Sequence, residues 1–261
     1  MPRSGKDSLI VALDVPTVDA ALRMVDTLDN VSFFKVGLQL FLTGELPRLL
    51  EALRQKRLFV DLKVPGDIAN TIGSVIDLCV RMGVRFLTLS ESMPLAAIGA
   101  AKIARENRQS PNPEFLTVPF LSSLDRNDLR DMTGDDDITR HILVRAKAAL
   151  EAGCDGVVAS GQEIMVCRTA FPKTTIVSPG IRPRGSSTDD HKRFTSPAEA
   201  IQLGSDYLVV GRPILKSPDP RRAAEEIISE IDAAIKIKEM AEAASSPSSS
   251  PKRTFMSALH I

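Results

Sequence analysis

The sequence predicts a (β/α)8 barrel, in which eight parallel strands alternate with eight helices. Short runs rich in β-branched and aromatic residues recur every few tens of residues, and each precedes a longer segment with helical periodicity. The runs are almost continuously apolar, which indicates strands buried on both faces, as in a parallel sheet covered by helices. A doubly wound open sheet is the competing arrangement.

The expected elements follow one another without interruption. The strand candidates are 9–14, 32–37, 57–62, 84–89, 114–119, 155–159, 174–178 and 206–210. The helix candidates are about 17–28, 43–54, 67–82, 94–107, 137–152, 161–170, 196–203 and 218–240. Several of these helices begin after Thr, Ser or Asp, which cap helix N-termini, and end near Gly or Asn. A chain of 261 residues has room for one barrel of eight such units.

Residues 1–240 are expected to form the single catalytic domain, and residues 241–261 a disordered C-terminal tail. From residue 241 the sequence reads AEAASSPSSSPKR, a low-complexity composition that buries too little apolar surface to become ordered. Two long connections, 120–136 and 179–195, follow the fifth and seventh strands. In a barrel, both would lie on the catalytic face.

Composition and charge argue against several classes of protein. Lys plus Arg and Asp plus Glu each total 33, so the formal net charge is +0 and no overall field attracts nucleic acid or anionic lipid. The longest apolar runs are far shorter than the roughly 20 residues that span a bilayer. The N-terminus has no apolar signal region, and the three cysteines fit neither a disulfide framework nor a zinc site. We therefore expect a cytoplasmic protein that binds neither membrane nor nucleic acid.

The motifs indicate neither a histidine-based metal site, nor a calcium loop, nor a dinucleotide site. The three histidines, His141, His191 and His260, form no ligand pattern. The acidic segment 131–137 lacks the ligand spacing of a calcium loop and is interpreted as a charged helix start. No Gly-x-Gly-x-x-Gly sequence follows a strand, so a dinucleotide is not indicated.

Charged residues stand at the carboxyl ends of the first three predicted strands, where the active site of a barrel opens. Asp14 ends the first strand, Lys35 lies within the second, and Asp61 and Lys63 end the third. A charged side chain in an apolar strand is costly unless it is paired or solvated. Four such residues facing one end indicate a functional site; the alternative is an inert ion-pair cluster that closes the barrel mouth.

Two segments that combine glycine and arginine predict a phosphate site. GIRPRG at 180–185 follows the seventh strand, and VVGRPI at 209–214 ends the eighth. Glycine lets the backbone approach a ligand closely, a helix N-terminus offers free N–H groups, and Arg adds a bidentate charge. The loops after strands seven and eight of barrels recurrently hold phosphate. The substrate is therefore expected to be a phosphate monoester.

The chain resembles the orotidine 5'-phosphate decarboxylase family, bacterial type, over about residues 8–215. The most specific part is VDLKVPGDIANT, an Asp-x-Lys motif followed by Asp-Ile-x-Asn-Thr. The resemblance implies decarboxylation of orotidine 5'-monophosphate to UMP and CO2 in de novo pyrimidine synthesis. The segments that carry it are LIVALD (9–14), FFKVGLQLF (33–41), VDLKVPGDIANT (60–71), FLSSLD (120–125), GIRPRG (180–185), DDHKRFTSP (189–197) and YLVVGRPI (207–214).

The same resemblance implies a homodimer with an active site at each subunit junction and no cofactor. The family's Lys-Asp-Lys-Asp network corresponds to Lys35, Asp61, Lys63 and Asp67 of the partner subunit. Lys63 is similar to the acid that protonates C6 of the pyrimidine as CO2 leaves. Asp61 resembles the group placed close to the substrate carboxylate, and Lys35 its ordering partner.

The resemblance also implies a set of substrate contacts. Asp14 resembles the acceptor of a ribose hydroxyl, and Thr71 of the partner subunit a second ribose contact. Ile68, which follows Asp67, is also expected among the substrate-binding residues. The pyrimidine amide edge is expected at Ser122 and Ser123, and the phosphate at Arg182, Gly211 and Arg212, with His191 as a solvated loop residue or a minor phosphate donor.

The sequence departs from the family pattern in three places. The usual spacing is Asp-x-Lys-x-x-Asp, whereas three residues, 64–66, separate Lys63 from Asp67. We expect a turn at Pro65 and Gly66 to absorb the extra residue. The other departures are His191, where the family commonly has Gln, and Ser90, where it often has His.

Two other functions fit part of the pattern. One is a magnesium-dependent sugar-phosphate lyase or decarboxylase of the same superfamily, which shares the Asp-x-Lys-x-x-Asp element and stabilises an enediolate with the metal. Ile68, the serine pair and the GIRP sequence favour the pyrimidine nucleotide over this alternative. The other is a non-catalytic nucleotide-binding barrel in which the longer spacing has disabled the chemistry.

Overall fold

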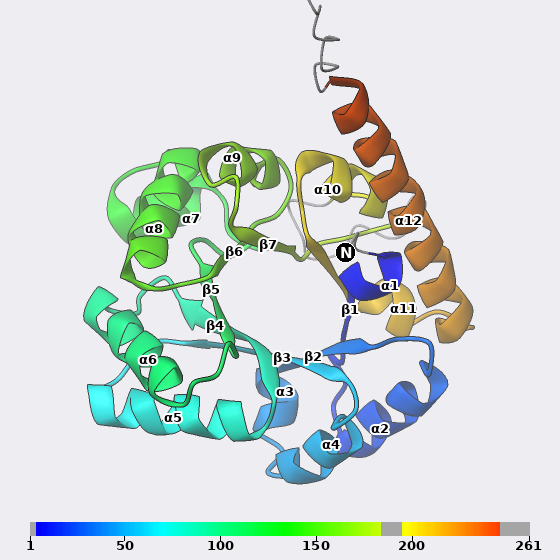
Figure 1. The fold of residues 1–261 in the computed structure, drawn as a ribbon, viewed down its shortest axis with the longest axis horizontal. Helices are drawn as coiled ribbons and strands as arrows, with labels where there is room; N and C mark the ends of the chain where they lie inside the picture. Colours follow the sequence, from blue (N-terminus) through cyan, green and yellow to red (C-terminus); the bar gives the residue numbers. More distant parts are fainter. Residues whose placement is uncertain (1–3, 184–194, 246–261) are drawn as a thin grey trace, which may run out of the picture.

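The chain folds into a closed barrel of eight parallel strands, which neighbour one another in chain order (Figure 1). The computed structural model describes residues 4–183 and 195–245. The strands are β1 Leu9–Ala12, β2 Phe33–Gly37, β3 Arg57–Val64, β4 Val84–Ser90, β5 Glu114–Val118, β6 Gly156–Val158, β7 Thr175–Ser178 and β8 Tyr207–Val210. Pairing of β1 with β8 closes the barrel, so the predicted (β/α)8 fold is confirmed and the open sheet is excluded.

Helices surround the strands on the outside of the barrel (Figure 1). The eight expected helices correspond to α2 Val18–Thr27, α4 Leu46–Ala52, α5 Ala69–Arg81, α6 Leu95–Asn107, α8 Ile138–Ala152, α9 Glu163–Ala170, α10 Pro197–Leu203 and α12 Pro220–Ser245. Four further helices lie in segments that were not expected to be helical: α1 Gly5–Ser8, α3 Leu38–Phe41, α7 Arg126–Thr133 and α11 Arg212–Leu215. Helix α1 precedes β1, and the other three lie in connections between a strand and the next helix, so the topology is unchanged.

Helix α7 changes the interpretation of the acidic segment 131–137, which is not simply a helix start. Asp125 and Asp128 form a capping box that begins α7, and the helix ends at Gly134 in the left-handed region, at φ 78°. Only the last acidic residue, Asp137, caps α8, where its side chain accepts a hydrogen bond from the Arg140 amide. The segment therefore joins two helices.

The C-terminal helix is longer than predicted. Helix α12 continues to Ser245, so its last five residues lie in the segment that was assigned to a disordered tail. Its first half packs on the barrel through buried residues spaced three or four apart, Ala224, Ile227, Ile231 and Ala234. Residues 241–244 are exposed, and Figure 1 shows this end of α12 extending beyond the neighbouring helices. Residues 246–261 lie outside the described residues.

The barrel interior is filled by aromatic rings near the amino ends of the strands. The rings of Phe33, Phe59, Phe86 and Tyr207 form tilted and edge-on pairs with centroids 5.0 to 5.9 Å apart. Alternate strand residues face outward into a larger apolar core against the helices. The aromatic packing closes one end of the barrel, and a pocket remains at the carboxyl ends of the strands. No helix in the described part of the chain is long and apolar enough to cross a membrane.

Candidate active site

A pocket at the carboxyl ends of the strands holds the charged residues that the sequence singled out. Asp14 follows β1, Lys35 lies in β2, and Asp61 and Lys63 lie in β3, and all four side chains line the pocket. Parallel strands of a barrel end at the same rim, so residues distant in the chain meet there. The predicted convergence of these four residues is confirmed.

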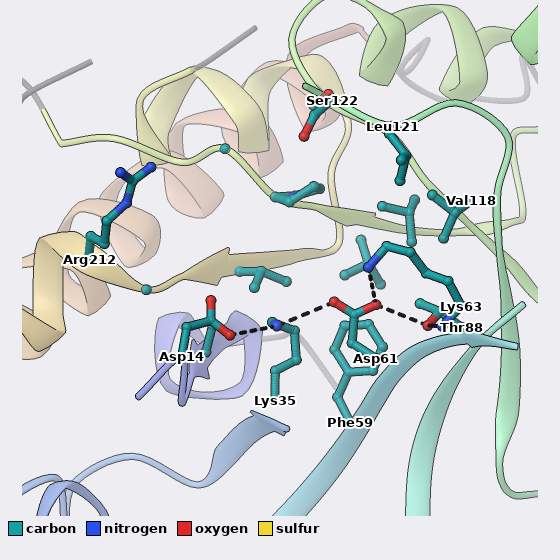
Figure 2. A pocket seen from close by; sticks show the side chains of 18 of the residues that line it. Asp14, Lys35, Phe59, Asp61, Lys63, Thr88, Val118, Leu121, Ser122 and Arg212 are labelled. Atoms are coloured by element: carbon teal, nitrogen blue, oxygen red, sulfur yellow. Dashed lines mark hydrogen bonds and ion pairs between the residues drawn. The ribbon is translucent and has the colours of Figure 1, made fainter. Parts of the chain in front are cut away.

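The four side chains form a chain of alternating charge (Figure 2). Lys35 Nζ lies 3.1 Å from Oδ1 of Asp14 and 3.3 Å from Oδ2 of Asp61. Lys63 Nζ donates a hydrogen bond to Oδ1 of Asp61 at 2.8 Å. Each carboxylate therefore contacts at least one ammonium group, and each ammonium group contacts at least one carboxylate.

Burial and pairing act in opposite directions on the two inner members of this chain. Burial alone would lower the pKa of Lys35, but attraction to Asp61 and Asp14 outweighs it, so the pKa lies above the ordinary 10.5. Burial alone would raise the pKa of Asp61, but attraction to Lys35 and Lys63, with hydrogen bonds from Lys63 and Thr88, brings it below the ordinary 3.8. Both side chains are therefore charged at neutral pH.

Lys63 occupies an unusual backbone position at the end of β3. Its φ is 50°, in the left-handed region that side chains other than Gly, Asn and Asp rarely adopt. The pairing of β3 with β4 shifts register between Val60 and Val64, so the strand bulges at Asp61 and Lys63. Such strain persists only where surrounding contacts hold it, and it is concentrated at functional sites.

The opposite side of the pocket carries two arginines. Arg182 follows β7 and is buried, with its amide donating to the Thr195 carbonyl at 2.9 Å and Nη1 donating to the Ile181 carbonyl at 2.8 Å. Arg212 begins α11 directly after β8, and Figure 2 shows it across the pocket from Lys63. Gly180 and Gly211 line the same side. Gly180 and Arg182 of one predicted phosphate segment thus meet Gly211 and Arg212 of the other at one wall.

The remaining predicted residues are distributed between the pocket and the surface. Ser122 lines the pocket, whereas Ser123 is exposed and is not among the lining residues. Asp67, Ile68 and Thr71 are exposed at the amino end of α5 and lie outside the pocket lining of their own chain. His191 lies outside the described residues.

The turn expected at Pro65 and Gly66 is not found, because β3 runs on to Val64 and residues 65–68 form an irregular connection to α5. Gly66 adopts φ 100°, and a Cβ built on it would approach Pro94 Cδ to 2.9 Å. Glycine is therefore required there for both its conformation and its small size. Ser90, in the place where the family often has His, bonds through its hydroxyl to that of Ser92 at 2.9 Å.

Two polar residues of the pocket were missed in the sequence. Thr88 lies in β4, with its hydroxyl 3.0 Å from Oδ1 of Asp61, and Ser160 lines the pocket after β6. A signal for Thr88 was present, because it is a polar residue in an apolar strand at the phase that faces the barrel interior. The sequence does not show which partner such a residue meets.

The described residues contain no group of three or more His, Cys, Asp or Glu side chains that could hold a metal ion. The cysteines are free and buried. Burial raises the pKa of Cys79 and Cys167 to about 11 and that of Cys154 to about 12, so the thiols are uncharged at neutral pH.

Comparison with known proteins gives a consistent assignment. The model of the orotidine 5'-phosphate decarboxylase / HUMPS family matches residues 7–227. Orotidine 5'-phosphate decarboxylase from Rhodopseudomonas palustris strain HaA2 is 42% identical over 233 residues, covering 87% of this chain and 96% of the relative. The protein of the same name from Pseudomonas fluorescens strain SBW25 is 39% identical over 226 residues, covering 85% of this chain and 97% of that relative.

The fold is also similar to a solved structure of the same description. The crystal structure of orotidine 5'-phosphate decarboxylase from Lactobacillus acidophilus matches with a TM-score of 0.72 and 29% sequence identity. The match covers 86% of this chain and 98% of that one. The similarity therefore extends over the whole barrel.

Proposed function

This chain belongs to the orotidine 5'-phosphate decarboxylase / HUMPS family, and we propose that it converts orotidine 5'-monophosphate to UMP and CO2 without a cofactor. The observation that supports this most directly is the alternating chain of Asp14, Lys35, Asp61 and Lys63, which faces two arginines across one pocket. The wall with the alternating charges would contact the reacting pyrimidine and the ribose, and the wall with the two arginines would bind the phosphate.

Lys63 is the proposed proton donor. When the bond from C6 of the pyrimidine to the carboxylate breaks, its electron pair stays on C6, which has no adjacent carbonyl to delocalise it. A fixed ammonium group stabilises this developing charge and then transfers a proton from Nζ to C6. The Lys63 side chain is 41% exposed, so water can return the proton after UMP leaves.

Asp61 and Lys35 hold this ammonium group in place. Asp61 accepts a hydrogen bond from Lys63 at 2.8 Å and is itself paired with the buried Lys35. In the proposed complex the Asp61 carboxylate lies close to the departing carboxylate of the substrate. Electrostatic interactions are stronger in this partly desolvated site than in water, so a preformed charge array contributes directly to lowering the barrier.

The other pocket residues bind the parts of the nucleotide that do not react. Asp14 accepts a hydrogen bond from a ribose hydroxyl, and Ser122 contacts the amide edge of the pyrimidine, whereas Ser123 is exposed and would reach that edge only from outside the pocket lining. Phosphate binding at a distance from C6 supplies binding energy that orients the base for the chemical step. The proposed phosphate ligands are Arg182, Gly211 and Arg212, with His191 as a further donor.

The active site is proposed to be completed by a second copy of the chain. Asp67 and Thr71 are polar and exposed, and Ile68 between them leaves 69% of its surface in water. Their position at the amino end of α5 suits a surface that enters the pocket of a partner. Asp67 of the partner subunit would then extend the charge array next to Lys63, and Thr71 of the partner subunit would contact the ribose.

The charge array also bears on the magnesium-dependent alternative. Lys35 contacts both Asp14 and Asp61, and Lys63 contacts Asp61, so two ammonium groups already neutralise the carboxylates that a divalent cation would need. We therefore propose turnover that is insensitive to EDTA. Loss of activity in EDTA, with recovery on addition of magnesium, would instead favour the metal-dependent sugar-phosphate enzyme.

The three free thiols suit the reducing cytoplasm, which is the proposed location.

The test is direct. Purified protein is mixed with orotidine 5'-monophosphate, and the absorbance of the substrate is followed for the parent and for Lys63→Ala. We expect decay with the parent and almost none with the variant. Binding of UMP without any decay would indicate a non-catalytic nucleotide-binding barrel, and equal rates for the two proteins would exclude Lys63 as the proton donor.

A further inference from the structure

The bulge at the end of β3 lies opposite a single residue of β4. Val60 pairs with Leu87, and Val64 pairs with Leu89, so residues 61–63 face Thr88 alone. The bulge withdraws the Lys63 amide from the regular ladder of main-chain hydrogen bonds. This N–H group is partly buried and needs another acceptor, because leaving it unpaired costs free energy.

The hydroxyl of Thr88 meets this need and makes a second hydrogen bond (Figure 2). Its Oγ1 accepts from the Lys63 amide at 2.9 Å and donates to Oδ1 of Asp61 at 3.0 Å. The directions are determined by chemistry, since an amide N–H only donates and a carboxylate only accepts. One hydroxyl, with one proton and two lone pairs, therefore links the backbone of Lys63 to the side chain of Asp61.

We infer that Thr88 is a positioning residue for the decarboxylation, whose hydroxyl holds the Lys63 backbone and the Asp61 carboxylate in their reactive arrangement. This role rests on the proposed function. Thr88 acts through Asp61 and Lys63 and has no bond to make or break in the reaction. Its hydroxyl accepts the Lys63 amide hydrogen bond and so stabilises the strained φ of Lys63. The same hydroxyl orients the Asp61 carboxylate, which accepts the hydrogen bond from the Lys63 ammonium group.

Burial makes this hydroxyl difficult to replace. Thr88 is 1% exposed, so water has little access to the Lys63 amide if the hydroxyl is removed. Burial alone would raise the pKa of Asp61, and the hydrogen bond from Thr88 is one of the interactions that instead lower it. Removing the hydroxyl therefore removes a hydrogen bond that holds the Lys63 backbone and one that stabilises the charged form of Asp61.

The test compares three variants with the parent. Thr88→Val keeps the shape of the side chain and removes the hydroxyl, whereas Thr88→Ser keeps the hydroxyl and removes the methyl group. Thr117→Val is the matched control, because Thr117 is an equally buried threonine of the neighbouring strand β5 and is not a lining residue of the pocket. Thermal unfolding of each variant checks that it is folded.

We expect kcat to fall about ten- to hundredfold in Thr88→Val, the effect of losing a hydrogen bond to a charged group. KM should change less than about threefold, because uniform substrate binding at the ribose and phosphate ends is untouched. Thr88→Ser and Thr117→Val should keep kcat close to that of the parent. A Thr88→Val enzyme with the parent's kcat, or a Thr88→Ser enzyme as slow as Thr88→Val, would overturn the inference.

A second measurement does not depend on turnover. Amide hydrogen exchange at Lys63, followed by NMR, should become faster in Thr88→Val and stay slow in Thr88→Ser and Thr117→Val. Unchanged protection in Thr88→Val would show that the hydroxyl does not hold the bulge and would overturn the inference. If the parent itself does not decarboxylate the nucleotide, the proposed function fails and the catalytic role of Thr88 fails with it. Loss of protection would then still demonstrate the structural link.

Discussion

Lys35 Nζ lies 3.3 Å from Oδ2 of Asp61, in a part of the barrel where the lysine side chain is 10% exposed and the aspartate side chain 15%. Neither charge is well solvated, and each is stabilised by the other. Replacing Lys35 leaves the buried Asp61 with the more exposed Lys63 as its ionic partner, so the cost exceeds the value of the lost contact itself. Substitution of either residue is therefore expected to lower both the stability and the activity of the protein substantially.

Lys35→Met should lower the free energy of unfolding by about 3 kcal/mol, the low end of the range for breaking a buried ion pair from one side, because Asp61 keeps its ion pair with Lys63. Urea unfolding at neutral pH measures this. Arg54→Met is the control, because its ion pair with Glu51 is exposed and is expected to contribute less than about 1 kcal/mol. Equal losses in the two variants would contradict the importance of the buried pair. Decarboxylation should also fall in Lys35→Met, since Asp61 loses its ordering partner.

The lowered pKa of Asp61 predicts how stability depends on pH. A carboxyl group whose pKa is lower in the folded state contributes stability that is present above its unfolded pKa, near 3.8, and is lost as pH falls through the folded pKa. The parent should therefore be more stable than Asp61→Asn at neutral pH, and the difference should shrink below about pH 3.8. Urea unfolding of both proteins across this range measures the difference, and a constant gap would argue against ionisation of Asp61 as its source.

Arg212→Ala should weaken binding of the nucleotide through its phosphate. Loss of a charge-assisted contact predicts a rise in KM of about ten- to hundredfold. Steady-state kinetics would measure this, and inorganic phosphate should inhibit the parent competitively but have less effect on the variant. Arg222→Ala, on the exposed face of α12, is the control and should leave KM unchanged. A normal KM for Arg212→Ala would remove this residue from the phosphate site.

Sharing of active sites between two subunits can be tested by mixing inactive variants. Lys63→Ala and Asp67→Ala should each be inactive as pure dimers. After subunit exchange, a mixed dimer has one site with both residues intact, so an equal mixture should recover about one quarter of the parent's activity. No recovery, despite mixed dimers detected by mass spectrometry, would mean that Asp67 does not act across the interface. Sedimentation showing a fully active monomer would contradict the dimer itself.

Much of the fold was predictable because its signals are local. Each strand is a short apolar run followed by an amphipathic helix, and the eight repetitions are visible without any knowledge of distant contacts. The short helices α1, α3 and α11 were missed because a few residues carry little periodicity. Helix α7 was missed because its capping box lies in a polar connection that looks like a loop. The end of α12 was misplaced because the change in composition at residue 241 precedes the end of the helix.

The candidate site was predictable to the extent that it follows from topology. Once the chain is a barrel, Asp14, Lys35, Asp61 and Lys63 must share one rim, and the structure brings them together. The bulge at residues 61–63 and its bond to Thr88 could not be predicted in this way. Strand register depends on two segments about 25 residues apart, and no local pattern specifies it.

The amino-acid sequence by itself determined the number and order of the strand-helix units and the identity of the charges at the open end of the barrel. These features can be read from the sequence because the spacing of apolar residues and the residue types are properties of short segments. Only the tertiary structure decided that Lys35 lies between two carboxylates and that one buried hydroxyl joins the Lys63 backbone to Asp61. Hydrogen bonds and ion pairs form only when the two partners are placed to within a few tenths of an ångström. That placement arises only when all eight strands close into the barrel.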